Sequence, residues 1–146
     1  MNSNEGLFQR PLHLRPTLIL LVFCGGTLGT AARQALSLLF PRTSGIPWTI
    51  FAINIAGAFV LGLLLELLIR KGPDTGSTQV TRLLLGTGFL GGFTTYSALA
   101  VDTVALMDDG SIGAGLLYSF ISVLIGLIAA AVGVFTASTV RAGRTS

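Results

Sequence analysis

The sequence has little charge, and this scarcity excludes most classes of soluble protein. Asp, Glu, Lys and Arg make up 10% of its 146 residues, whereas a soluble domain carries about 25%. Hydrophobic residues make up 51% of the chain, and the mean hydropathy is +0.80. A chain of this length and composition is expected to be one domain embedded in a lipid bilayer.

Residues that carry chemistry are equally scarce. The lone cysteine, Cys24, cannot form an intrachain disulfide, and the lone histidine, His13, lies in a polar N-terminal stretch. No spacing typical of a zinc site, a catalytic triad or a phosphate-binding loop occurs, so we expect no enzyme. The net charge of +3 comes from basic residues that flank apolar segments. These residues predict a membrane topology and not nucleic-acid binding.

Four apolar segments are each long enough to cross a bilayer. They run from about 17 to 40, 48 to 69, 83 to 107 and 112 to 140. The sequence therefore predicts an all-α membrane protein with four transmembrane helices. We expect a polar N-terminal tail over residues 1–15, a transmembrane domain over 16–140 and a basic C-terminal tail over 141–146.

Basic residues are distributed unevenly between the two sides of such a bundle. With four spans, both termini and the second loop share one side, which carries Arg10, Arg15, Arg70, Lys71, Arg82, Arg141 and Arg144. The opposite side carries Arg42, with Asp108 and Asp109 nearby. Because cytoplasmic loops are enriched in Lys and Arg, both termini are expected in the cytoplasm, with the chain in the plasma membrane.

The third apolar segment contains a run that is poor material for a continuous helix. Between Gly86 and Ser97 it holds many glycine and hydroxyl residues. In lipid, unwound backbone is tolerated only where protein buries it or where it lines a water-filled cavity. Broken spans of this kind commonly mark ion sites. The third helix is therefore expected to be broken in the middle, with carbonyl oxygens that suit a hard cation such as Na⁺.

Other polar side chains lie within the apolar segments, and each has a structural alternative. Arg33 either faces an aqueous vestibule or extends to the nearby interface. Asn54 either joins helices or donates hydrogen bonds to an anion. Tyr118 and Ser122, four residues apart, form either one wall of a polar track or a helix contact. Glu66 is expected to pair with the residue four positions later, Arg70.

These features together resemble the Fluc (CrcB) family of fluoride channels. The resemblance covers about residues 25 to 133 and rests on motifs in three spans. The motifs are Gly25-Gly26-x-x-Gly29-x-x-x-Arg33, then Pro47-Trp48 followed by Asn54-x-x-Gly57-x-Phe59-x-x-Gly62, then Gly88-Phe89-Leu90-Gly91-Gly92-Phe93-Thr94-Thr95-Tyr96-Ser97. Each motif is weak alone, but all three in order on a four-span chain are specific.

The resemblance implies an antiparallel, dual-topology-type dimer with two fluoride pores, which allow passive efflux of fluoride from the cytoplasm. It implies a structural Na⁺ at the dimer interface, held by the backbone carbonyls of Gly91 and Thr94. It also implies roles at the pore for a set of side chains. These are Asn54, Tyr96, Leu99, Tyr118 and Ser122 at the fluoride pore, with Arg33 in a supporting vestibule.

The chain departs from the family pattern in its pore lining. The family has two phenylalanines three residues apart, whose electropositive ring edges can face an anion. Here the positions hold Tyr96 and Leu99, which share a helix face, and Gly126 stands where a hydroxyl is expected. Many family members have little loop-charge bias and form homodimers. The strong bias here favours a heterodimer with a homologous subunit of opposite orientation.

Two alternatives to a channel remain open. A small multidrug-type transporter also has four short helices, but it needs a membrane-embedded carboxylate in the first span, where this chain has only Arg33. A non-conducting membrane assembly subunit would use the same polar residues for packing alone. Loss of fluoride flux without loss of dimer assembly after substitution of Asn54 separates these interpretations.

Overall fold

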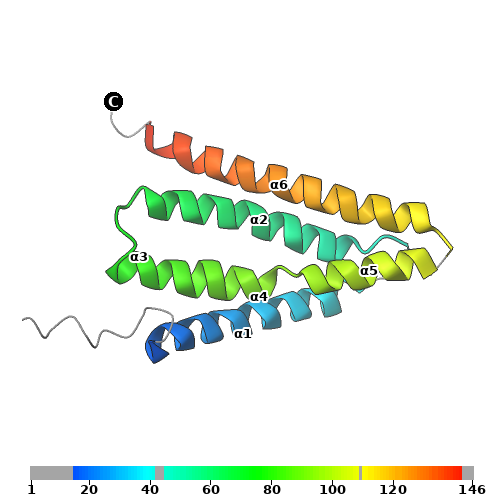
Figure 1. Cartoon of the computed structure of the whole chain (residues 1–146), viewed down its shortest axis with the longest axis horizontal. Coiled ribbons are helices and arrows are strands. Elements are labelled where there is room, and N and C mark those ends of the chain that lie inside the picture. Colours follow the sequence, from blue (N-terminus) through cyan, green and yellow to red (C-terminus); the bar gives the residue numbers. More distant parts are fainter. Residues whose placement is uncertain (1–14, 42–44, 109, 143–146) are drawn as a thin grey trace, which may run out of the picture.

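The protein folds into long helices that lie side by side (Figure 1). The computed structural model describes residues 15–41, 45–108 and 110–142, and they contain no β-strand. The elements in chain order are α1 (Pro16–Leu39), α2 (Trp48–Ile69), α3 (Gly76–Thr81), η2 (Arg82–Leu90), α4 (Gly91–Phe93), α5 (Tyr96–Asp108) and α6 (Ile112–Ala142). The predicted tails over residues 1–15 and 141–146 lie almost wholly outside the described residues.

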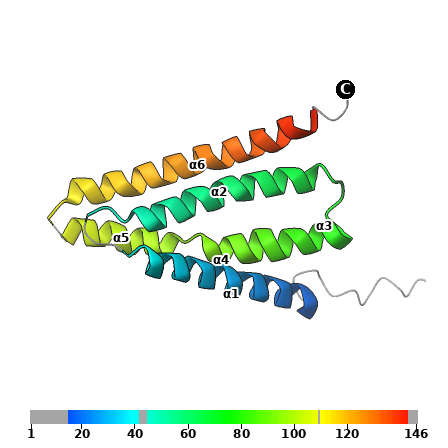
Figure 2. The same cartoon turned by 180° about the vertical axis from the view of Figure 1, so that it is seen from behind.

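Four spans are confirmed within the described residues. The helices long and apolar enough to cross a membrane are Pro16–Leu39, Trp48–Ile69, Gly76–Asp108 and Ile112–Thr139. The start of α1, the end of α2, α3 and the end of α6 lie at one end of the bundle (Figure 1 and Figure 2). Arg15, Arg70, Lys71 and Arg82 belong to that end, whereas Arg33 lies in the second half of α1.

The third span begins earlier than the sequence indicated. The sequence predicts a start at about residue 83, but Gly76–Thr81 already forms helix α3, so the loop after α2 is short. Asp74 and Arg82 form an ion pair, with 2.7 Å between Oδ2 and a terminal guanidinium nitrogen. The pair joins the loop to the first residue of η2. The turn between α2 and the third span is therefore short and tied to the helix that follows it.

The third helix is bent, as predicted, but its glycines are not unwound (Figure 1). The nine residues Arg82–Leu90 form a π-helix, a conformation that accounts for well under 1% of residues in globular proteins. One short turn, α4, follows, and only then does Thr94 adopt an extended backbone, with φ −76° and ψ 154°. The expectation of unwound backbone from Gly86 onward is therefore wrong in its extent. Glycine destabilises a helix by only about 1 kcal/mol, which packing against a neighbour can offset.

Glycines bring α1 against the third span at backbone distance. A Cβ built on Gly25 would lie inside contact distance of the Leu84 carbonyl oxygen, and one on Gly29 would meet the Phe89 carbonyl oxygen in the same way. α2 and α6 meet similarly, since a Cβ on Gly62 would overlap the Ala130 carbonyl oxygen. Small residues let membrane helices pack closely where lipid provides no hydrophobic driving force between them. The glycines of the first motif therefore serve packing.

We predict that Gly25→Ala destabilises the subunit by about 1–3 kcal/mol, the usual range for overpacking. The added methyl group meets backbone atoms, which cannot move aside as a flexible side chain can. Gly113→Ala is the control, because a Cβ at that position meets nothing within 4 Å. Thermal unfolding of the purified protein in detergent measures the difference. Equal stability of the two variants would contradict the proposed packing.

Candidate functional site

The candidate site is the interruption between α4 and α5. Thr94 makes the last helical bond, from its amide to the Leu90 carbonyl oxygen at 2.9 Å, its hydroxyl donates to the same oxygen at 2.8 Å, and its extended backbone ends the helix. Thr95 starts the second, because its hydroxyl accepts a hydrogen bond of 3.2 Å from the Ala98 amide. A threonine that binds the amide three residues later is a typical helix N-cap. Two adjacent threonines therefore stop one helix and start the next.

Asn54, on α2, stabilises this interruption with two hydrogen bonds to Thr95. Its Nδ2 donates to the Thr95 carbonyl oxygen at 3.0 Å, and its Oδ1 accepts from the Thr95 amide at 2.8 Å. The side chain thus satisfies both backbone groups of one residue that has left the helix. An amide carries two N–H donors, so one remains beyond the bond to Thr95. The helix-joining role that the sequence left open is therefore present, and it does not use all the donors of Asn54.

α1 contacts the same interruption from the other side. The Gly92 carbonyl oxygen accepts from the Thr30 hydroxyl at 3.3 Å and from Arg33 Nε in a long contact of 3.5 Å. Arg33 is half-buried, as expected of a charged side chain that faces protein or a cavity and not lipid. The break is consequently supported from two neighbouring helices, α1 and α2.

The carbonyls predicted to hold a cation lie at this break. In a continuous helix the Gly91 carbonyl would accept from the Thr95 amide, but Asn54 takes that amide instead. Thr94 is extended, so its own carbonyl also leaves the helical direction, and Gly91 is exposed on the surface of the subunit. Carbonyl oxygens without carboxylates are a donor set that fits Na⁺. The described residues contain no group of three or more His, Cys, Asp or Glu placed to hold another metal.

The remaining residues predicted for the pore have contrasting environments. Tyr118 and Ser122 are both buried on α6, 6% and 5% exposed, and the Ser122 hydroxyl donates to the Tyr118 carbonyl oxygen. Leu99, 6% exposed, packs with Tyr118, whereas Tyr96 is 80% exposed. Residues three apart are about 60° apart around a helix. The edge of the buried face falls between Tyr96 and Leu99, so they do not share one environment within the subunit.

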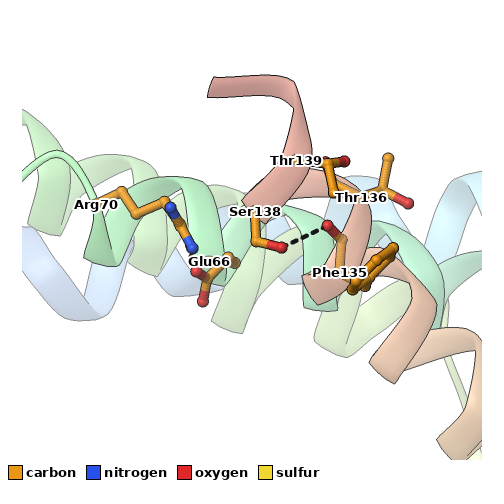
Figure 3. A network of polar contacts seen from close by, with 6 residues as sticks. All are labelled: Glu66, Arg70, Phe135, Thr136, Ser138 and Thr139. Carbon is orange, nitrogen blue, oxygen red and sulfur yellow. Dashed lines mark hydrogen bonds and ion pairs between the residues drawn. The ribbon is translucent and has the colours of Figure 1, made fainter. Parts of the chain in front are cut away.

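A second polar cluster lies at the basic end of the bundle, away from the break (Figure 3). Glu66 and Arg70 form the predicted ion pair on α2, with 2.5 Å between the carboxylate and Nε. On α6, the Ser138 hydroxyl donates to the Phe135 carbonyl oxygen at 2.7 Å. The Glu66–Arg70 pair is four residues apart on one helix, and we assign it to helix stability.

Two residues of the site are not among those predicted from the sequence. Thr30 stands three residues before Arg33 and therefore shares its face, a spacing that could have identified it. Thr95 appears in the sequence analysis only as one position of the third motif, Gly88 to Ser97. The signal that could have identified it is a hydroxyl residue followed by a helical segment, the usual N-cap pattern.

The fold and this site define a class of protein: a four-span membrane protein whose third helix is broken at Thr94 and Thr95, with neighbouring helices hydrogen-bonded to the break. Comparison with known proteins agrees. The profile of a family described as "CrcB-like protein, Camphor Resistance (CrcB)" matches residues 20–134. The chain belongs to this family.

Several relatives carry the same functional name. The chain is 51% identical over 124 residues to fluoride-specific ion channel FluC 2 of Leifsonia xyli subsp. xyli, covering 85% of this chain and 86% of the relative. It is 46% identical over 147 residues to fluoride-specific ion channel FluC 1 of Cutibacterium acnes, covering 100% of both chains. It is 41% identical over 116 residues to a fluoride-specific ion channel FluC of Thermus thermophilus, covering 78% of this chain and 90% of the relative.

We predict that Thr95→Ala destabilises the break by about 1 kcal/mol, the typical cost of losing an N-cap. The Ala98 amide then loses its hydroxyl partner, so its hydrogen exchange should accelerate about five- to tenfold, as that free energy implies. Thr95→Ser keeps the hydroxyl and is the matched control. Unchanged exchange at Ala98 in Thr95→Ala would contradict the capping role.

Proposed function

We propose that the chain is a subunit of a fluoride channel that lets fluoride leave the cytoplasm passively. The observation that carries this proposal is the break at Thr94–Thr95, held by Asn54 inside a membrane-spanning helix. Relatives at 40–51% identity are named fluoride-specific ion channels. HF crosses membranes as a neutral acid and ionises inside the cell, and a channel then returns the anion down its electrochemical gradient.

The chemistry of the site suits a small, strongly hydrated anion. Such an ion enters a pore only where hydrogen-bond donors replace its water. The second N–H of Asn54 and the hydroxyl group of Tyr118 are candidate donors, and the Ser122 hydroxyl becomes one if it turns away from the Tyr118 carbonyl oxygen. The first turn of α5 adds the positive end of a 13-residue helix. Arg33 supplies a fixed positive charge on the other side of the break and attracts anions toward it.

We propose that the pore is completed between two subunits. Tyr96 is exposed on the membrane-embedded surface and Leu99 is buried, so the two positions serve different surfaces. An exposed tyrosine can present its ring edge and hydroxyl to a path shared with a partner, while Leu99 fills the interior next to Tyr118. The departure from the family's two aromatic rings supports a pair of subunits in which one pore is altered.

A structural Na⁺ at the dimer interface is part of the proposal. The Gly91 carbonyl has lost its usual helical donor, and Gly91 is exposed, so a neighbouring subunit can approach it. With Thr94, each subunit would supply two carbonyl oxygens. A bound Na⁺ would supply positive charge that neutralises these dipoles and fixes the two breaks against each other. Within this chain, Asn54 binds the Thr95 amide and so keeps the Gly91 carbonyl from its usual helical hydrogen bond.

We also propose that both termini lie in the cytoplasm and that the partner is a homologous chain of opposite orientation. Seven basic residues on one side against one on the other favour a fixed orientation. An antiparallel dimer then requires a second chain with the reverse bias. The numbered names FluC 1 and FluC 2 among the relatives are consistent with channels built from two different chains.

We predict that Asn54→Asp lowers fluoride efflux at least tenfold from liposomes that contain this chain together with an oppositely oriented homologue. Aspartate keeps an oxygen that accepts from the Thr95 amide but loses every N–H donor for the anion. A fluoride electrode measures efflux, and cross-linking measures assembly, which should persist. Ser119→Ala is the control, since that hydroxyl donates to the Leu116 carbonyl oxygen of its own helix, α6. Normal efflux in Asn54→Asp would refute the donor role.

We further predict that this chain alone conducts poorly and that co-expression with an oppositely oriented homologue restores fluoride efflux. The fixed orientation leaves a single chain without an antiparallel partner. Efflux from liposomes containing either chain or both tests this directly. Fast fluoride efflux with this chain alone would favour a homodimer and overturn the heteromeric assignment.

A further inference from the structure

A groove runs along the exposed side of α1, in the middle of the first span. It has a volume of about 610 Å³. Its lining consists of Phe23, Gly26, Thr27, Thr30, Ala31 and Gln34. Residues at these spacings follow one face of a helix for three turns. The groove therefore lies at hydrocarbon depth, although its lining includes two hydroxyl groups and an amide.

The polar groups of this groove differ in whether they have a hydrogen-bond partner within the subunit. The Thr27 hydroxyl donates to the Phe23 carbonyl oxygen at 2.9 Å, and the Thr30 hydroxyl donates to the Gly92 carbonyl oxygen at 3.3 Å. Gln34 is exposed, and its side chain makes no hydrogen bond to any residue that the structure describes. Its two N–H donors and its carbonyl oxygen all require partners. Lipid tails provide none, so an amide at this depth must face protein or water.

The surroundings favour protein, and specifically a second subunit. Thr30 lines the groove and also binds Gly92 at the break, and a Cβ on Gly92 would overlap the Gly26 backbone. The groove therefore contacts the break at Gly92, next in the chain to the exposed Gly91, whose carbonyl we assign to a site shared between subunits. Small residues along the groove allow a helix to approach closely, and polar side chains on such surfaces hydrogen-bond across membrane helices.

We propose that this α1 groove seats the second four-span subunit and that the Gln34 amide hydrogen-bonds to it. The inference deepens the proposed function, since it rests on the pairing of two subunits. It assigns Gln34 to subunit recognition and places the contact between subunits on the same side of the molecule as the break. Water in a vestibule and acyl chains of lipid are the two other occupants that an experiment must separate.

The test uses full-length protein in its assembled form, reconstituted in lipid, with Cys24→Ser to remove the native thiol. A nitroxide is attached at Gln34→Cys or, as a control, at Leu28→Cys. Leu28 is 62% exposed and lies six residues from Gln34, about 120° away around α1. Oxygen dissolves in lipid and a nickel chelate dissolves in water, so their collision rates with the nitroxide report which medium surrounds each position.

A seated subunit predicts low collision rates with both reagents at position 34 and a high oxygen rate at position 28. A high nickel rate at position 34 would identify a water-filled vestibule, and a high oxygen rate would identify lipid, and either result overturns the proposal. Cross-linking of the same samples reports assembly. If the dimer assembles but position 34 is accessible to oxygen or to the nickel chelate, only this inference is overturned. If the chain never pairs, the proposed pairing of subunits is overturned as well.

A second pair of variants avoids a bulky label at the interface. Gln34→Ala should lower the dimeric fraction several-fold when the protein is diluted into excess lipid, and Leu28→Ala should leave it unchanged. The helical content of both variants by circular dichroism separates weaker pairing from misfolding. Equal dimerisation of well-folded Gln34→Ala and Leu28→Ala would contradict the role of the amide.

Discussion

The bilayer provides no water to a backbone that leaves its helix, and this constraint explains the arrangement of the whole subunit. An unsatisfied peptide group costs several kcal/mol in hydrocarbon. Thr95 lies between the two helices, and a single side chain, Asn54, hydrogen-bonds to both its amide and its carbonyl oxygen. The Gly92 carbonyl receives donors from Thr30 and Arg33 instead. The break persists because neighbouring helices provide what water would provide in a soluble protein.

These side chains are short, so the helices that carry them must come close. Gly25 and Gly29 allow the backbone of α1 to contact that of the third span, which brings Thr30 within reach of Gly92. The π-helix before the break belongs to the same contact, since Leu84 and Phe89 lie within it. Wide helical turns of this kind occur frequently at functional sites. Packing and function are therefore joined here: the glycines that stabilise the bundle also position the groups that hold the break.

Much of this architecture could be predicted from the sequence, because its signals are strong and local. Span length follows from hydropathy, and a run from Gly86 to Ser97 predicts an interrupted helix without any coordinates. The position of the interruption could not be predicted, because glycine tolerates both wide helix and unwound chain when a neighbour packs against it. The bond between Asn54 and Thr95 joins residues 41 positions apart and depends on how α2 meets the third span. The different exposures of Tyr96 and Leu99 likewise depend on which face α6 covers.

The subunit leaves polar groups on its surface that a lipid-facing protein would hide, and they lie near one another. Gly91 is exposed beside a carbonyl bound by Thr30, and Thr30 lines the groove that contains Gln34. A partner seated in that groove would contact Thr30, which also donates to the Gly92 carbonyl oxygen. The groove and the break are connected by one hydrogen bond and by the close contact between Gly26 and Gly92. Under the proposed pairing, contact between subunits and the geometry of the break are therefore coupled through Thr30 and Gly26 on α1.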